Sequence, residues 1–278
     1  MTEEGMTSPL EETDAAEPPP RKRRKGIYVL PNAITLAALF GGFYAIVMAM
    51  NGRFEAAAIG IFCAMVLDSL DGRVARMTQT QSAFGEQMDS LSDMVSFGAA
   101  PALIVYEWSL KGLGKIGWVA AFVYVAGAAL RLARFNTNIG VVDKRFFQGL
   151  PSPAAAALVV GFIWLMDDAG YKGADGIPWL SWAAFAMTLY AGLTMVTNVP
   201  FYSFKVVGFK RTVPFIVIVA VALAIALINL HPPIALFGLF CLYGLSGYGV
   251  YVWRKMQGQP VSVIATSTDE PDEAGLHR

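Results

Sequence analysis

The sequence predicts an all-α integral membrane protein with about eight transmembrane helices. Three observations support this fold class. Apolar residues make up 55% of the 278-residue chain, the mean hydropathy is +0.51, and the basic residues collect on alternate connections between long apolar segments. Soluble proteins of this length are usually less apolar. The formal net charge is zero, which says little about partners; where the charges lie is more informative. No nucleic-acid partner is expected for a membrane protein of this kind.

The predicted helices follow one another with short connections. A helix needs about 20 mostly apolar residues to cross a hydrocarbon layer of ~30 Å. Segments of this kind are predicted at residues 33–50, 54–76, 83–109, 116–136, 152–167, 178–199, 212–230 and 233–253. The second and third carry several charged residues and are the least typical of the eight.

The distribution of Lys and Arg predicts the orientation of these helices. If the basic run Arg21–Lys25 is cytosolic, only Arg53, Lys111, Lys115 and Lys172 of the 21 Lys and Arg residues fall on the outer side. Cytosolic loops of membrane proteins carry most of the Lys and Arg. We therefore expect a multi-pass protein of the cell membrane with both termini in the cytosol.

The two ends of the chain are polar and lack apolar periodicity. We expect residues 1–26 and 257–278 to be disordered cytosolic tails around a transmembrane domain at 27–256. Cys63 and Cys241 lie inside predicted spans, where a cysteine is usually a small buried side chain. No disulfide is expected.

Four aspartates lie where a membrane-spanning chain should least contain them. Asp68 and Asp71 end the second span, and Asp89 and Asp93 begin the third. Each charged side chain at a helix centre costs about 2.5–3.5 kcal/mol to insert. Residues three or four apart share a helix face, and the short polar linker 77–82 makes the two spans antiparallel. All four carboxylates can therefore meet near the cytosolic face.

Divalent cations are the partner that such a group indicates. Four carboxylates without nearby His or Cys suit Mg²⁺ or Mn²⁺, and two such ions would balance four negative charges. Paired metal ions stabilise the charge on a phosphate centre during displacement. The alternative is an ion-pair network with Arg73 and Arg76, but two arginines cannot balance four carboxylates.

The motif around these residues resembles the signature of the CDP-alcohol phosphotransferases. The matching positions are Asp68, Asp71, Gly72, Ala75, Arg76, Gly85, Asp89 and Asp93. Three further segments are similar to the phosphatidylserine synthase branch of that family: residues 31–35, 130–136 and 147–153. The resemblance covers residues 31 to about 160.

This resemblance implies a reaction and a set of roles. The hydroxyl of L-serine would attack the β-phosphorus of CDP-diacylglycerol, which gives phosphatidylserine and releases CMP. Asp68, Asp71 and Asp89 would bind metal, and Asp93 would act as the general base and also contact the second metal. Residues expected to bind CDP-diacylglycerol are Asn32, Thr35, Gly72, Arg76, Ser82 and Gly85. A homodimer is also implied.

The acceptor pocket follows from the resemblance less directly. Serine carries a carboxylate, so a selective pocket needs a cation near the metal site. Arg131, Arg134 and Asn136 end the fourth span, and we hypothesise that Arg131 or Arg134 holds the serine carboxylate. Both arginines could instead serve only as positive anchors at the cytosolic side.

Two alternatives stay open at this point. Within the family, the acceptor could be glycerol 3-phosphate, or inositol or its phosphate. A different class of protein, a cation transporter, would also place acidic residues inside spans. A transport path would need polar residues that continue toward the outer face, and the segments there are largely apolar.

Overall fold

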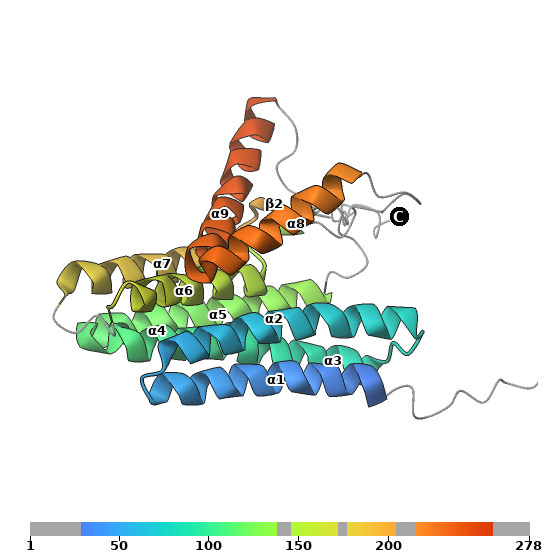
Figure 1. Cartoon of the computed structure of the whole chain (residues 1–278), viewed down its shortest axis with the longest axis horizontal. Coiled ribbons are helices and arrows are strands. Elements are labelled where there is room, and N and C mark those ends of the chain that lie inside the picture. The colour runs from blue at the N-terminus through green and yellow to red at the C-terminus, as the bar shows by residue number, and fades with distance from the viewer. Residues whose placement is uncertain (1–28, 138–145, 172–176, 204–214, 258–278) are drawn as a thin grey trace, which may run out of the picture.

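The computed structural model describes residues 29–137, 146–171, 177–203 and 215–257 (Figure 1). The basic run Arg21–Lys25 and nearly all of the two predicted tails lie outside these residues. The helices are α1 (Val29–Met50), α2 (Phe54–Met77), α3 (Ala83–Asp93), α4 (Ala100–Trp108), α5 (Lys115–Thr137), α6 (Ser152–Asp168), α7 (Pro178–Val196), α8 (Phe215–Leu230) and α9 (Pro232–Met256). A π-helical segment, η2 (Met94–Ala99), joins α3 to α4, and a short 3₁₀ segment, η3 (Leu110–Leu113), precedes α5.

Helices α1 to α7 form one bundle in which neighbours lie side by side, and α8 and α9 rise from one side of it (Figure 1). Helix α6 is the most enclosed, because every residue from Ala154 to Trp164 is buried. It packs against α2, α4, α7 and α9. Its first turns are alanine-rich, and small side chains allow membrane helices to approach closely.

The pairing of α1 with α2 also depends on small residues. A Cβ atom on Gly41 would lie 3.2 Å from the carbonyl oxygen of Gly60, so the two backbones are nearly in contact. Ala45, Ala57 and Ala64 are buried in the same interface region of the core. This close pairing brings the N-terminal end of α1 to the C-terminal end of α2, where the aspartates are.

Four helices are long and apolar enough to cross a membrane: α1, α5, α7 and α9, with hydropathies of 2.0, 1.7, 1.3 and 1.5. Large apolar side chains are exposed along them, among them Phe40, Phe122, Leu193 and Leu242. An apolar exterior of this kind favours contact with lipid. The chain is therefore a mostly helical protein with the character of a membrane protein.

The structure agrees with the expected helical fold, adds one short pair of strands to it, and ends one predicted span early. The predicted span at 178–199 ends at Val196, because Thr197 turns to an extended conformation. The chain then forms the short strand β2 (Pro200–Tyr202), which pairs antiparallel with β1 (Phe146–Gln148). The predicted span at 83–109 is one continuous helical rod that ends at Trp108, but η2 widens it in the middle. Of the predicted span at 212–230, residues 212–214 lie outside the described part.

Candidate functional site

The turn between α2 and α3 is fixed by its own side chains. The Thr78 hydroxyl donates to the Val74 carbonyl at 2.7 Å as α2 ends, and the Thr78 and Thr80 hydroxyls share a hydrogen bond of 2.7 Å. Ser82 caps α3, because its hydroxyl oxygen accepts a hydrogen bond from the Gly85 N–H at 3.0 Å. The linker therefore reverses the chain within a few residues, as its composition predicts.

This reversal brings carboxylates from both helices together. One oxygen each of Asp68, Asp71 and Asp89 lies within 4.8 Å of the others. We call these three residues the carboxylate group. Asp71 is 4% exposed, whereas Asp68 and Asp89 are half-buried. Oxygen atoms this close can bind one divalent cation together.

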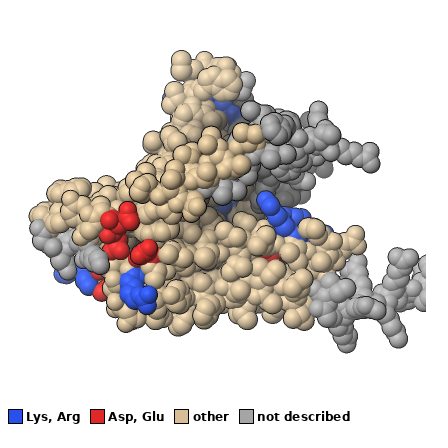
Figure 2. Space-filling view, in the orientation of Figure 1, with Lys and Arg blue, Asp and Glu red and all other residues tan. Residues whose placement is uncertain are grey.

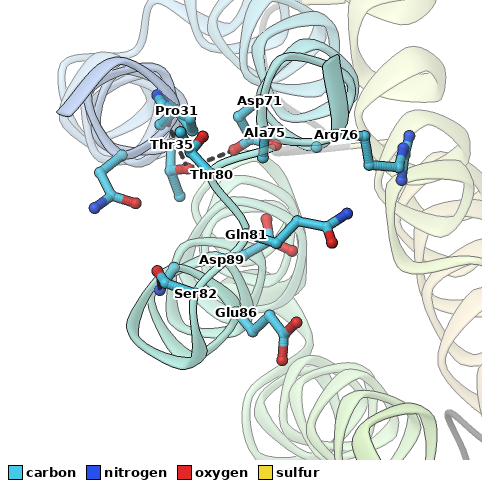
Figure 3. A pocket seen from close by; sticks show the side chains of 13 residues that line it. Pro31, Thr35, Asp71, Ala75, Arg76, Thr80, Gln81, Ser82, Glu86 and Asp89 are labelled. Atoms are coloured by element: carbon cyan, nitrogen blue, oxygen red, sulfur yellow. Dashed lines mark hydrogen bonds between the residues drawn. The ribbon is translucent and has the colours of Figure 1, made fainter. Parts of the chain in front are cut away.

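Helix α1 supports the carboxylate group from the side. The Thr35 hydroxyl lies 2.6 Å from Asp71 Oδ2 and 3.1 Å from the Pro31 carbonyl oxygen. A hydroxyl has one proton to donate, and the shorter contact to an ionised acceptor is the stronger of the two. Thr35 therefore fixes the orientation of the buried Asp71 carboxylate (Figure 3).

Asp93 lies one helical turn beyond Asp89 and does not belong to the carboxylate group. It is within hydrogen-bonding reach of Asp68, and the charges of Asp68, Asp89 and Arg131 all act on it. Its Oδ1 atom is buried and has no hydrogen-bond partner among the described residues. A buried carboxylate oxygen without a partner is costly, so this atom is a candidate ligand for an ion or a proton.

A cavity of about 250 Å³ opens beside the carboxylate group. Its walls come from the N-terminal end of α1, the C-terminal end of α2 and the start of α3 (Figure 3). The lining residues are Pro31, Asn32, Thr35, Asp71, Gly72, Ala75, Arg76, Thr80, Gln81, Ser82, Gly85, Glu86 and Asp89. All six residues expected to bind CDP-diacylglycerol are among them.

Glycine keeps part of this cavity open. A Cβ atom on Gly85 would lie 3.2 Å from Ser82 Oγ and 3.3 Å from Asn32 Oδ1. Asn32, Ser82 and Gly85 therefore meet at one point of the wall, although Asn32 is on α1 and the other two begin α3. A larger side chain at Gly85 would crowd these polar atoms and reduce the space for a ligand.

The arginines of α2 do not enclose the carboxylate group. Figure 3 shows Arg76 pointing away from Asp71 and Asp89, and Arg73 is exposed. The arrangement gives little support to a network in which these two arginines neutralise the aspartates. Arg76 instead lies along the cavity wall, where its Nη1 would be 3.9 Å from a Cβ atom on Gly72.

The three expected acceptor residues have different surroundings. Arg131 Nη1 donates to Ser152 Oγ at 2.8 Å, and its buried Nε has no hydrogen-bond partner among the described residues. Its charge acts on Asp93. Arg134 donates to Asn198 Oδ1 at 3.3 Å, at the exposed end of the bundle.

Asn136 connects two helices near the carboxylate group. Its amide donates to Ser90 Oγ at 2.9 Å, and Ser90 follows Asp89. Among the three expected acceptor residues, Arg131 is placed so that its charge acts on Asp93, whereas Arg134 and Asn136 connect α5 to neighbouring segments. Lys144 and Arg145, the other basic residues of this connection, lie outside the described residues.

Several polar residues at this end of the bundle were not expected from the sequence. Thr80, Gln81 and Glu86 line the cavity, and Ser152 holds Arg131. Ser152 lies between Pro151 and Pro153, at the residue where the predicted span 152–167 begins. Its partner is on another helix, so spacing along the chain carries no signal for the contact.

A second cavity, of about 340 Å³, lies at the opposite end of the bundle. Its lining includes Arg53, Glu55 and Asp167. Figure 2 shows acidic side chains gathered there over the end of α6 and the start of α2, with a basic side chain beside them. None of the expected site residues lines this cavity.

Comparison with known proteins gives consistent matches. The family model described as CDP-alcohol phosphatidyltransferase matches residues 28–264. A CDP-diacylglycerol–serine O-phosphatidyltransferase of Helicobacter pylori (strain ATCC 700392 / 26695) is 36% identical over 220 residues, which is 79% of this chain and 90% of the relative. The protein of the same description from Mycobacterium leprae (strain TN) is 32% identical over 232 residues, 81% of this chain and 75% of the relative.

A third relative matches over a shorter part of the chain. The CDP-diacylglycerol–serine O-phosphatidyltransferase of Methanocaldococcus jannaschii is 35% identical over 191 residues, which is 68% of this chain and 82% of the relative. The matches thus extend well beyond the aspartate motif, over most of the helical bundle.

Proposed function

Because the chain belongs to the CDP-alcohol phosphatidyltransferase family, we propose that it transfers the phosphatidyl group of CDP-diacylglycerol to the hydroxyl of L-serine and releases CMP. The observation that carries this proposal is the similarity to relatives described as serine phosphatidyltransferases over 79% of the chain. The carboxylate group beside a polar cavity supports the same chemistry.

The residues present fit a pair of divalent cations. Asp68, Asp71 and Asp89 offer oxygen ligands within 4.8 Å of one another, and the buried Asp93 Oδ1 has no hydrogen-bond partner among the described residues. Together these four aspartates would hold Mg²⁺ or Mn²⁺, which suit all-oxygen ligands. When bound, the cations would neutralise the diphosphate and favour the alkoxide form of the acceptor.

The cavity between α1, α2 and α3 is the proposed site for the CDP part of the lipid. Asn32, Ser82 and Gly85 offer hydrogen-bonding groups and space at one wall. Arg76, on another wall, can offset negative charge on the diphosphate as CMP leaves, because its guanidinium is always charged. Gly72 and Thr35 complete the set, and Thr35 also orients Asp71.

Asp93 is the proposed general base. A serine hydroxyl is a weak nucleophile until it loses its proton, and a carboxylate within hydrogen-bonding reach can accept that proton during attack. The proton goes from the serine hydroxyl to Asp93, the new bond forms between the serine oxygen and the β-phosphorus, and the bond from that phosphorus to the oxygen of CMP breaks.

Arg131 is the proposed ligand of the serine carboxylate. One of its donors is bonded to Ser152, but Nε is buried without a hydrogen-bond partner among the described residues. An arginine with free donors can bind a carboxylate through two parallel hydrogen bonds. Its position beside Asp93 would bring the serine hydroxyl to the base. Arg134 and Asn136 would line the more exposed, outer part of the acceptor site.

The proposal includes the arrangement in the cell membrane. Eight spans, with the carboxylate group toward the cytosol and both termini cytosolic, agree with the distribution of Lys and Arg. Exposed Trp118, Trp179 and Trp182 lie near the ends of α5 and α7 opposite to the carboxylate group, and tryptophan is common at membrane interfaces. Residues 27–256 would form the catalytic domain between tails at 1–26 and 257–278.

A reconstituted assay tests the reaction. Purified protein would be mixed with CDP-diacylglycerol, Mn²⁺ or Mg²⁺ and one acceptor at a time: L-serine, glycerol 3-phosphate, inositol or inositol phosphate. We expect CMP release and phosphatidylserine with L-serine. Faster CMP release with another acceptor would replace serine in the proposal, and cation uptake into vesicles without any CMP release would favour a transporter. Light scattering in detergent tests the homodimer that the resemblance implies.

A further inference from the structure

The helix that carries Asp89 and Asp93 widens directly after Asp93. Residues Met94–Ala99 are π-helical, and the Ala100 N–H donates to the carbonyl of Val95, five residues earlier. Such a wide turn adds one residue to the helix, which rotates everything beyond it by about 100° relative to a regular helix. The direction of Asp93 relative to the buried helix α4 therefore depends on the wide turn.

Three hydroxyl groups hold this turn: one from α5, which donates to the turn, and two from the turn and the residue before Asp93, which donate to α1. Tyr124 of α5 is fully buried, and its hydroxyl donates to the Phe97 carbonyl at 3.0 Å. On the other side, the Ser96 hydroxyl donates to the Ala38 carbonyl of α1 at 3.2 Å. Ser92, which precedes Asp93, donates to the Thr35 carbonyl at 3.3 Å. The turn is therefore fixed to α1 and to α5 at the same time.

The contact with α1 is as close as backbones allow. A Cβ atom on Gly42 would lie 2.7 Å from Ser96 Cα, so only glycine fits there. The α1 side of the turn is thus held by packing as well as by hydroxyls. On the α5 side, the hydroxyl of Tyr124 is the polar contact that the structure gives with the turn.

Tyr124 lies on the same face of α5 as Arg131, the proposed ligand of the serine carboxylate. Arg131 follows it on α5 by seven residues, two helical turns, so both side chains lie on one face of the helix. The charge of Arg131 acts on Asp93. One face of α5 therefore fixes the wide turn at Phe97 and provides the cation beside Asp93.

We propose that Tyr124 is a positioning residue for the transfer reaction, because its hydrogen bond to Phe97 sets the wide turn that directs the Asp93 carboxylate toward Asp68 and the acceptor. This inference rests on the proposed function of Asp93. Without the hydroxyl, the Phe97 carbonyl loses a buried partner and the turn can relax toward regular helix. Asp93, at the end of α3 beside the turn, then changes direction, whereas Ser82 and Gly85 lie at the start of that helix, where the Ser82 cap holds them.

Tyr124→Phe tests the proposal, with Tyr190→Phe as the matched control. The Tyr190 hydroxyl also donates to a helix carbonyl, that of Gly244, at 2.8 Å, but none of the carboxylates is involved. We expect Tyr124→Phe to lower kcat about tenfold, the effect of one lost buried hydrogen bond on the reacting geometry. The KM for CDP-diacylglycerol and the Tm should match those of Tyr190→Phe.

Ser96→Ala is a second, independent test of the same turn, because it removes the hydrogen bond from Ser96 to the Ala38 carbonyl. We expect the same signature, a lower kcat with unchanged KM for CDP-diacylglycerol. If both variants keep the kcat of the Tyr190→Phe control, the proposal is overturned. It is also overturned if kcat and CDP-diacylglycerol affinity fall in parallel, since Tyr124 would then only support packing. Absence of CMP release by the unmodified protein would instead refute the proposed function.

Discussion

The hydrogen bond between Thr35 and Asp71 allows a quantitative test of the metal site. Thr35→Val keeps the shape of the side chain and removes the hydroxyl that lies 2.6 Å from Asp71 Oδ2. Asp71 is 4% exposed, so water cannot readily replace the lost donor. A hydrogen bond to a charged group contributes about 1.5–3 kcal/mol, which corresponds to about a 10- to 100-fold change in an equilibrium constant. Loss of a residue that orients a metal ligand typically weakens metal affinity by a similar factor.

The rate of CMP release, measured against Mn²⁺ concentration with both substrates saturating, reports this change. We expect Thr35→Val to raise the half-maximal Mn²⁺ concentration about 10- to 100-fold. Thr35→Ser keeps the hydroxyl and should resemble the unmodified protein. Thr188→Val removes a fully buried hydroxyl that donates to the Ala184 carbonyl at 2.7 Å, far from the carboxylates, and controls for packing. An unchanged Mn²⁺ requirement in Thr35→Val would refute the reasoning.

Further predictions concern the base, the acceptor, the cavity and the metal. Asp93→Asn should keep CDP-diacylglycerol binding but lower kcat by about 10²- to 10⁴-fold, and normal turnover would exclude Asp93 as the base. Arg131→Ala should raise the KM for serine about 10- to 100-fold, and Arg134→Ala should raise it less. If Arg134→Ala has the larger effect, Arg134 and not Arg131 binds the carboxylate of the serine substrate. Gly85→Ala, whose new Cβ would meet polar atoms at 3.2 and 3.3 Å, should raise the KM for CDP-diacylglycerol, whereas Gly249→Ala, with nothing within 4 Å, should not. EDTA should stop CMP release and excess Mn²⁺ should restore it; chelator-resistant synthesis would contradict the metal assignment.

The extent to which the fold follows from the sequence differs between segments. Hydropathy alone indicates α1, α5, α7 and α9, because each is a long apolar run. It cannot indicate the wide turn after Asp93, because that turn depends on Tyr124 and on α1, whose contacting residues are 27 and 58 positions away along the chain. Strands β1 and β2 have three residues each, too few for an alternating pattern.

In the site, too, contacts between residues close in the sequence could be predicted, whereas contacts between residues far apart in the sequence could not. Helical spacing and the short linker predict that the aspartates of α2 and α3 meet, and the structure brings Asp68, Asp71 and Asp89 together. The partner of Asp71 is Thr35, which lies 36 residues earlier and was expected only near the nucleotide. Sequence position cannot separate Arg131 from Arg134 either, because their different partners come from other parts of the fold.

The hydrogen bond from Thr35 to Asp71 joins two residues that are both synthesised early in translation. Thr35 and all members of the carboxylate group belong to the first three helices of the chain. The ribosome has therefore joined all of these residues into the chain before it begins the codons of α5. The contacts of the buried Asp71 carboxylate, with Thr35 and with the other two members of the group, therefore need no residue from the C-terminal half of the chain.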